Sequence, residues 1–182
     1  MKRHFGFLLL LSALFVPGSV KAEYYDTTLL TLFSKILPRI VSASNLAPKA
    51  GEPLGVCIVR DEVDASAAAV FGALLANAVR THGIEIVQTD FSHVEVCGKR
   101  PLLFLFNASP ETVSTALSSL TTFSPMVAAY DYRLLSSGAD VSLFVGRSVK
   151  PYVNLESLRG KGIRLEPIIL QVSKIYGRES EQ

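Results

Sequence analysis

The sequence predicts an α/β fold: a mostly parallel sheet with helices on both faces, an antiparallel hairpin at the sheet edge and an N-terminal amphipathic helix. Short apolar runs rich in β-branched residues alternate with helical segments, which is typical of a parallel sheet with right-handed crossovers. The last two runs are so close together that they predict a hairpin. With 182 residues, 49% of them hydrophobic, the chain can build one domain with a sizeable core.

The start of the chain has the pattern of a secretory signal peptide. A short basic segment precedes an apolar run at residues 5–16, and small or β-branched residues stand at Val20 and Ala22, the positions that precede cleavage. The run is shorter than the ~20 apolar residues that span a bilayer, and no Cys follows it to carry a lipid anchor. We therefore expect residues 1–22 to be removed and residues 23–182 to form a single periplasmic domain. A retained N-terminal anchor is the alternative.

Cleavage would change the charge of the protein. The whole chain has 18 Lys and Arg against 16 Asp and Glu, a net charge of +2. The first 22 residues contain three of the basic residues, so the mature chain would have 15 against 16 and a net charge of −1. This balance predicts no basic surface for nucleic acid or anionic lipid.

Residues 26–44 predict the N-terminal helix. Its apolar residues recur at helical spacing and form one face. They are Leu29, Leu30, Phe33, Ile36, Leu37 and Ile40. We expect this face to pack in the core, with a partner groove as the alternative. Pro38 should kink the helix or end it early, and residues 45–53 predict a loop.

Four apolar runs follow. Helical segments separate the first run from the second and the third from the fourth, whereas residues 90–100, between the second and the third, are polar and irregular. The expected strands are residues 54–59, 84–87, 102–106 and 126–130. Asp64 can cap a helix that extends to about residue 81. Ser109, followed by Pro110 and Glu111, opens a second helix that extends to about residue 120.

The rest of the chain predicts the edge of the sheet and a closing helix. The expected elements are a short turn or helix, two strands, a helical turn and a terminal helix, at residues 131–138, 141–145, 149–153, 156–159 and 166–176. The three residues between the two strands predict a hairpin turn. Phe144 and Tyr152 lie on these strands, where we expect them to pack on the sheet rather than stack on a ligand.

Cys57 and Cys97 are the two cysteines of the chain. Export would place them in an oxidising compartment, where a disulfide closing a loop of about 40 residues would stabilise the fold by ~3–4 kcal/mol. We therefore predict a Cys57–Cys97 disulfide. A buried free thiol at Cys57 and a structural zinc site with His82 and His93 are the alternatives. The zinc pattern is weak, and we expect no metal.

The sequence lacks the usual motifs of nucleotide and hydrolytic enzymes. Ligands of an open α/β sheet bind beyond the carboxyl ends of the strands, and the first such end, residues 60–64, has no glycine-rich phosphate loop. No Gly-x-Ser-x-Gly nucleophile motif occurs. We therefore expect no dinucleotide- or nucleotide-dependent enzyme. An exported thiol enzyme using Cys57 or Cys97 is the alternative.

Three positions at predicted strand ends resemble the layout of a phosphoacceptor receiver domain. They are Asp61-Glu62, Asn107 and Lys150-Pro151. In that family the residue after the third strand is an aspartate that takes the phosphoryl group. Asn107 cannot form an acyl phosphate, so the resemblance implies shared architecture and no receiver function.

A second resemblance is carried by the C-terminal segment. Residues 152–165 read Tyr-Val-Asn-Leu-Glu-Ser-Leu-Arg-Gly-Lys-Gly-Ile-Arg-Leu, and Ile169-Leu170 and Val172-Ser173-Lys174 follow. This pattern resembles the end of the YfiR-like family: a strand, an Asn-Leu pair, a helical turn with basic residues, a Gly before an aliphatic-basic-aliphatic triplet, and a helix with paired Leu. The predicted signal peptide, the length, Cys57 and Cys97 also resemble that family.

The resemblance implies a periplasmic repressor that is not an enzyme and needs no cofactor. Such proteins bind the periplasmic part of an inner-membrane diguanylate cyclase, hold it inactive, tend to dimerise and respond to redox state through their disulfides. A related sensor such as a histidine kinase is an equivalent partner. Two departures affect the N-terminal packing and the start of the last helix: the chain has no Trp, and Glu166-Pro167 replace a Ser pair.

Four residues of the resembling segment are candidate partner-binding residues: Asn154, Arg159, Lys161 and Arg164. The asparagine could instead cap the following turn, and the basic residues could form a solvated face.

A small-molecule-binding component of a transporter or sensor system is the alternative function. Its mark would be a deep pocket lined by aromatic residues at the strand ends near Arg60, Asn107 and Asp131.

Overall fold

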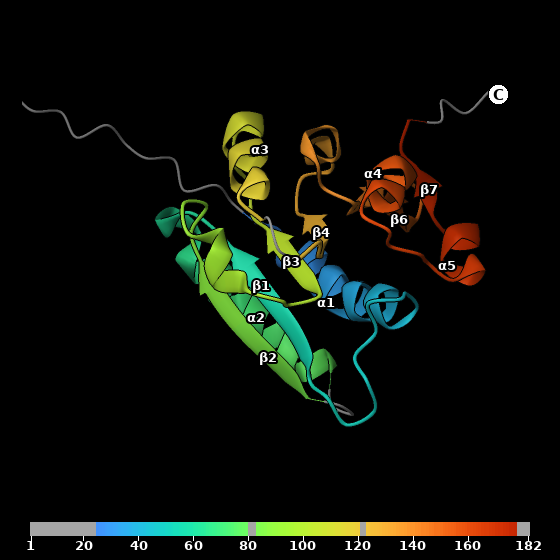
Figure 1. Cartoon of the computed structure of the whole chain (residues 1–182), viewed down its shortest axis with the longest axis horizontal. Coiled ribbons are helices and arrows are strands. Elements are labelled where there is room, and N and C mark those ends of the chain that lie inside the picture. Colours follow the sequence, from blue (N-terminus) through green and yellow to red (C-terminus); the bar gives the residue numbers. More distant parts are fainter. Residues whose placement is uncertain (1–24, 80–82, 121–122, 178–182) are drawn as a thin grey trace, which may run out of the picture.

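A computed structural model of the chain describes residues 25–79, 83–120 and 123–177, so the predicted signal peptide lies outside the described residues. Within them the chain forms a seven-stranded sheet in the order β2-β1-β3-β4-β5-β6-β7 (Figure 1). The strands are β1 (Leu54–Val59), β2 (Ile84–Thr89), β3 (Leu102–Leu105), β4 (Met126–Ala129), β5 (Val141–Val145), β6 (Val149–Val153) and β7 (Lys174–Ile175).

The strand directions confirm the predicted fold class. Strands β1 to β5 are mutually parallel, β6 is antiparallel to β5, and β7 is parallel to β6. Because β1 pairs with both β2 and β3, the strand order reverses at β1 and β3, which is where open sheets of this kind bind ligands. The predicted β5–β6 hairpin forms, and β7 adds a further strand outside it.

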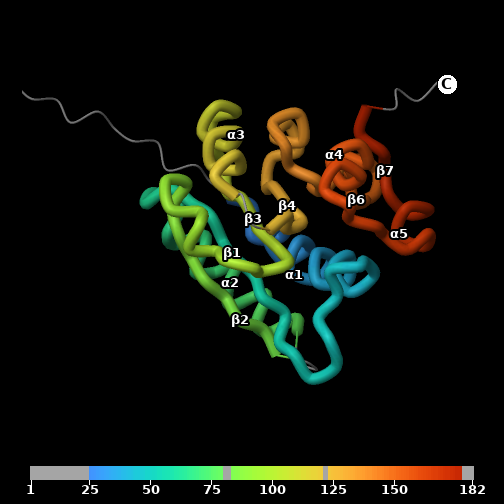
Figure 2. Tube along the Cα trace, in the orientation of Figure 1, coloured from blue at the N-terminus to red at the C-terminus, as the bar shows by residue number. Residues whose placement is uncertain are grey.

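One face of the sheet is covered by α1 (Thr27–Ser42) and α2 (Ala65–Ala78), which lie together in Figure 2. The 3-10 turn η1 (Glu62–Asp64) leads into α2. Four fully buried rings fill this layer: Phe33, Phe71, Phe104 and Phe106. The ring centroid of Phe104 in β3 is 4.2 Å from that of Phe71 and 5.2 Å from that of Phe33. Burial of each such ring contributes about 1.5–3 kcal/mol, so this apolar layer fixes α1 and α2 on the sheet.

The other face is covered by shorter helices. These are η2 (Val94–Cys97), α3 (Pro110–Ser118) and η3 (Tyr132–Ser137). They pack on alternate residues of the central strands, such as Leu103, Leu105 and Val127. Because both faces of β3 and β4 are buried, these strands are wholly apolar, as the sequence predicts. None of the helices in the described ranges has the length and apolarity that a bilayer crossing requires.

The prediction that Pro38 ends the first helix early is wrong. Helix α1 begins after Asp26, whose Oδ1 accepts a hydrogen bond of 2.7 Å from the Thr28 backbone N–H, and it continues to Ser42. Its apolar face extends beyond the proline to Ile40, which is fully buried. Tertiary packing of that face outweighs the ~3 kcal/mol that an interior proline costs.

The prediction of one helix over residues 166–176 is also wrong. Helix α4 (Leu155–Gly160) forms as expected, but α5 (Pro167–Val172) ends early and residues 174–175 form β7. Pairing with β6 satisfies backbone groups that would otherwise be left open at the sheet edge, and it brings Ile175 against the core. Helix α2 ends at Ala78, although the predicted end is near residue 81.

The predicted disulfide is present. Cys57 in β1 bonds to Cys97 at the end of η2, the Cα atoms are 5.4 Å apart, and both residues are fully buried. The two alternatives, a free thiol and a zinc site, are therefore wrong, because both sulfurs are in the bond. The bond ties η2 to the sheet, and it fits an oxidising compartment.

Loss of this disulfide should destabilise the fold substantially. We expect the Cys57→Ala, Cys97→Ala variant to lose about 4 kcal/mol of unfolding free energy, because the bond closes a loop of about 40 residues in the unfolded chain. Urea unfolding followed by circular dichroism measures this. Reductant should lower the midpoint of the wild type and leave that of the variant unchanged; a wild-type midpoint that does not move, although alkylation shows both thiols reduced, would contradict the prediction.

Candidate functional site

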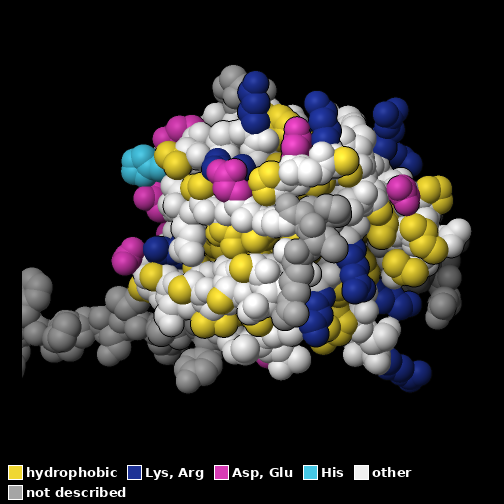
Figure 3. Space-filling view, turned by 90° about the horizontal axis from the view of Figure 1, so that it is seen from below, with side chains coloured by type: hydrophobic (Ala, Val, Ile, Leu, Met, Phe, Trp, Pro, Cys, Tyr) yellow, Lys and Arg dark blue, Asp and Glu magenta, His cyan; other side chains and the backbone are white. Residues whose placement is uncertain are grey.

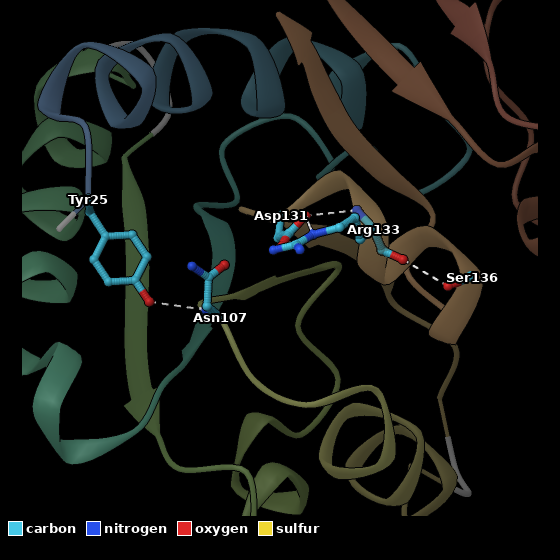
Figure 4. A network of polar contacts seen from close by, with 5 residues as sticks. All are labelled: Tyr25, Asn107, Asp131, Arg133 and Ser136. Atoms are coloured by element: carbon cyan, nitrogen blue, oxygen red, sulfur yellow. Dashed lines mark hydrogen bonds and ion pairs between the residues drawn. The ribbon is translucent and has the colours of Figure 1, made fainter. Parts of the chain in front are cut away.

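Open sheets of this kind bind ligands at the carboxyl edge, and Tyr25 lies at this edge. Its hydroxyl accepts a hydrogen bond of 3.1 Å from the backbone N–H of Asn107, which follows β3 (Figure 4). Its ring centroid is 4.7 Å from those of Phe106 and Tyr130. The segment before α1 thus places an aromatic ring over the switch point, where the small-molecule hypothesis expects a pocket. Sequence reasoning missed Tyr25.

Asn107 has an unsatisfied polar atom. Its side-chain Oδ1 is buried and has no hydrogen-bond partner among the described residues. A buried acceptor without a partner costs about 1–3 kcal/mol, so such atoms usually receive a hydrogen bond from water or a ligand. Asn107 is therefore the group at this edge that is best suited to bind a small polar molecule.

Asp131, after β4, is held by a neighbouring cation. Its carboxylate accepts hydrogen bonds from Arg133 through the backbone N–H at 2.9 Å and through Nε at 2.7 Å (Figure 4). Burial raises the pKa of Asp131, but the hydrogen bonds from Arg133 outweigh it and hold the pKa below its ordinary value. The Ser136 hydroxyl donates to the Arg133 carbonyl at 2.8 Å. Asp131 is thus ionised at neutral pH, and its low pKa and its pairing with Arg133 make it a weak general base.

The other predicted strand-end groups pair locally. Arg60 donates to Gln88 in β2 and to Glu62, both at 3.3 Å. His93 is exposed and lies 2.9 Å from Asp90, whereas His82 lies outside the described residues. The receiver-like positions therefore share a sheet edge of the expected architecture. Within the described ranges, no cluster of His, Cys, Asp and Glu has the arrangement that would hold a metal ion.

The four candidate partner-binding residues differ in their contacts and exposure. Asn154 caps α4, because its Oδ1 accepts from the Ser157 backbone N–H at 3.1 Å. Lys161 reaches into the protein, whereas Arg159 and Arg164 are exposed. A role for these residues in partner binding stays a prediction, and the structure adds a capping role for the asparagine.

Lys161 is held by Asp140, a buried carboxylate that sequence reasoning missed. Asp140 is fully buried and accepts hydrogen bonds from Lys161 Nζ at 2.7 Å, Ser157 Oγ at 2.6 Å and the Val127 backbone N–H at 2.7 Å. Burial raises its pKa above the ordinary value, while these three donors act in the opposite direction. The sequence signal for this buried carboxylate is a single acidic residue, Asp140, directly before the apolar strand β5.

One further cluster joins aromatic rings and lysines on β5, β6 and β7. We call it the aromatic–lysine surface, and it consists of Tyr132, Phe144, Lys150, Tyr152, Lys174 and Tyr176. Tyr152 is central, with its ring centroid 5.7 Å from those of Phe144 and Tyr176 and 6.1 Å from that of Tyr132. The predicted packing of Phe144 and Tyr152 on the sheet is confirmed.

The lysines of this surface alternate with the rings. Lys150 lies opposite Phe144 across the hairpin, and Lys174 lies opposite Tyr152. The Lys174 ammonium is 3.7 Å from the centroid of the Phe144 ring, a cation–π contact. All six side chains are at least partly exposed, and Tyr132 is 50% exposed.

Comparison with known proteins supports the fold. No family model and no curated protein matches the chain. Among solved structures, a conserved domain protein from Vibrio cholerae is 12% identical with a TM-score of 0.58, covering 80% of this chain and 59% of its own. An ABC domain from Streptococcus pneumoniae in complex with L-Trp is 7% identical with a TM-score of 0.56, covering 76% and 58%. The chain thus spans less than two thirds of either neighbour.

Removal of Lys161 should make stability depend on pH. Lys161→Met leaves Asp140 buried without its cation, which should cost about 3–5 kcal/mol near pH 8. Loss of the ammonium raises the folded-state pKa of Asp140 further, so between the unfolded and folded pKa values the folded state binds more protons than the unfolded state. Stability relative to wild type should therefore recover as the pH falls from about 8 to about 5.

Urea unfolding at a series of pH values measures this effect. Arg159→Met removes an exposed basic residue from the same segment, so it is the matched control and should stay within about 0.5 kcal/mol of wild type at each pH. A Lys161→Met variant with a constant destabilisation across the pH range would contradict the prediction.

Proposed function

We propose that this chain is an exported regulatory binding protein that holds a membrane-bound partner, a diguanylate cyclase or a related sensor such as a histidine kinase, in its inactive state. The observation that carries the proposal is the aromatic–lysine surface. A protein of this kind acts in the periplasm by binding, needs no cofactor and performs no catalysis; a homodimer is its expected form.

The composition of the surface favours a protein partner. Tyrosine is enriched among the residues that dominate the binding energy of protein interfaces, because its ring buries apolar area and its hydroxyl forms hydrogen bonds. Neither Lys150 nor Lys174 takes part in an ion pair among the described residues. Two ammonium groups without an ion-pair partner suit a partner segment that supplies carboxylates.

The surface overlaps the segment that carries the resemblance to the YfiR-like family. Tyr152 and Lys174 mark the two ends of the segment that resembles that family most closely, and both belong to the aromatic–lysine surface. The proposed contact therefore uses the same segment as the implied repressor function. A repressor of this kind must bind the inactive state of its partner more tightly by several kcal/mol.

The carboxyl edge of the sheet supports binding rather than catalysis. Asp131 is paired with Arg133, Glu62 pairs with Arg60, and the group after β3 is the amide of Asn107. An acid–base or nucleophilic mechanism needs a group whose protonation changes near neutral pH within reach of a reacting atom. At this edge the carboxylates of Asp131 and Glu62 are instead held by arginines.

Capture of a membrane partner tests the proposal. The tagged protein should recover a diguanylate cyclase or sensor kinase from detergent-solubilised inner membranes of its own organism. Tyr132→Ala should weaken the recovered complex about 30-fold if this ring is central to the interface. Lys174→Glu should also weaken it, because the new carboxylate repels the acidic partner segment. Titration of the purified partner measures both effects.

Two exposed positions outside the surface provide matched controls. Val96 is 54% exposed, close to the value for Tyr132, and Lys99 is an exposed lysine before β3. Val96→Ala and Lys99→Glu should leave the affinity unchanged. The proposal fails if the controls weaken the complex as much as the surface variants do, or if no cyclase or sensor is recovered.

A small-molecule-binding component of a transporter or sensor system is the second candidate function. The unsatisfied Oδ1 of Asn107 favours it, as does the fold similarity to an ABC domain in complex with L-Trp. A group that donates a hydrogen bond, such as the ammonium of an amino acid, would satisfy that oxygen.

Thermal unfolding with a panel of free amino acids separates the two functions. A rise in melting temperature that saturates with ligand, and that Asn107→Leu abolishes while Val96→Ala does not, would support the second candidate. Unchanged melting temperatures across the panel would count against it.

A further inference from the structure

The opposite face of the C-terminal strands carries a groove. It lies between α1, β6 and α5, and its volume is about 590 Å³. Its apolar lining comes from Ile36 and Ile40 of α1, Val149 and Pro151 of β6, and Ile169 and Val172 of α5. A volume in the range of about 300–1,000 Å³ is typical of sites for small molecules.

Helix α5 is apolar and yet largely uncovered. Five of its six residues are apolar, but none of them is buried, and Ile168 and Val172 are 56% and 51% exposed. Figure 3 shows hydrophobic side chains gathered at the right-hand end of the molecule, the end that α5 occupies in Figure 1, with Lys and Arg side chains beside them. An apolar patch of this kind on a soluble domain marks a binding site.

Two cations line the groove, Lys150 of β6 on one wall and Arg39 of α1 on another. Arg39 lies in the last turn of α1, lines the groove and is exposed. None of the ion pairs among the described residues includes Arg39. A guanidinium binds a carboxylate through two parallel hydrogen bonds, so this wall favours a ligand with one negative end.

We infer that the groove binds a free long-chain carboxylate, with the alkyl chain along α5 and β6 and the carboxylate at Arg39. The size of the groove favours an alkyl chain over a helical partner segment, because two turns of a helix about 10 Å across occupy roughly 850 Å³. The groove shares Lys150 with the aromatic–lysine surface, but Arg39 and Val172 belong to the groove alone, so each proposal stands or fails on its own experiment.

Two ligands that differ in their polar end test the inference. Dodecanoate and 1-dodecanol share an alkyl chain, and calorimetric titration of the purified protein measures the affinity for each. Arg39→Met should weaken dodecanoate binding about tenfold, since a charge-assisted hydrogen bond is lost. The same variant should change the affinity for the neutral alcohol less than twofold, because the apolar lining is intact.

A second variant locates the alkyl chain. Val172→Glu places a carboxylate in the groove and should abolish binding of dodecanoate, whereas Val96→Glu changes a residue of similar exposure elsewhere and should not. Val172 and Val96 are 51% and 54% exposed, so both variants should fold. The inference is overturned if the wild type shows no saturable binding, if Arg39→Met weakens both ligands equally, or if Val172→Glu binds dodecanoate normally.

Discussion

The buried carboxylate of Asp140 holds the two halves of the sheet together. Between β4 and β5 the paired ladder is short, with Ala128 opposite Val141, so few backbone hydrogen bonds join the parallel strands to the C-terminal hairpin. Asp140 bridges this junction, because it accepts hydrogen bonds from the β4 backbone and from Ser157 and Lys161 of the C-terminal segment. Burial makes the carboxylate costly without these donors, so the junction has one favoured geometry.

The pleat of β6 gives the C-terminal half two surfaces of different chemistry. Lys150 and Tyr152 contribute to the aromatic–lysine surface, whereas Val149 and Pro151 line the apolar groove, which Lys150 also borders. Side chains of a strand alternate between faces, so five residues can supply both. A protein partner on one surface and a long-chain carboxylate in the groove would therefore both contact β6. This strand belongs to the C-terminal half that Asp140 joins to the rest of the sheet.

The sequence predicted correctly those parts of the fold in which one local pattern decides the structure. The apolar runs over β1, β3 and β5 are too short to form helices and lack helical spacing, so each forms a strand. The pairing of Cys57 with Cys97 followed from their number and the expected compartment. The parts that it missed, such as Tyr25 over the strand ends, depend on contacts between residues far apart in the chain.

The sequence by itself determined the order of most strands and helices along the chain and the parallel direction of the sheet, because hydrophobic periodicity and connection length are local properties. It also determined the disulfide, because the chain has two cysteines. Only the tertiary structure decided that residues 174–175 leave the last helix and pair with β6, and that Lys161 turns inward to Asp140 while Arg159 stays exposed. The physical reason is that the free-energy cost of an unpaired backbone group at a sheet edge, or of a buried charge, depends on its hydrogen-bonding and ion-pair partners. The chain brings these partners together only on folding.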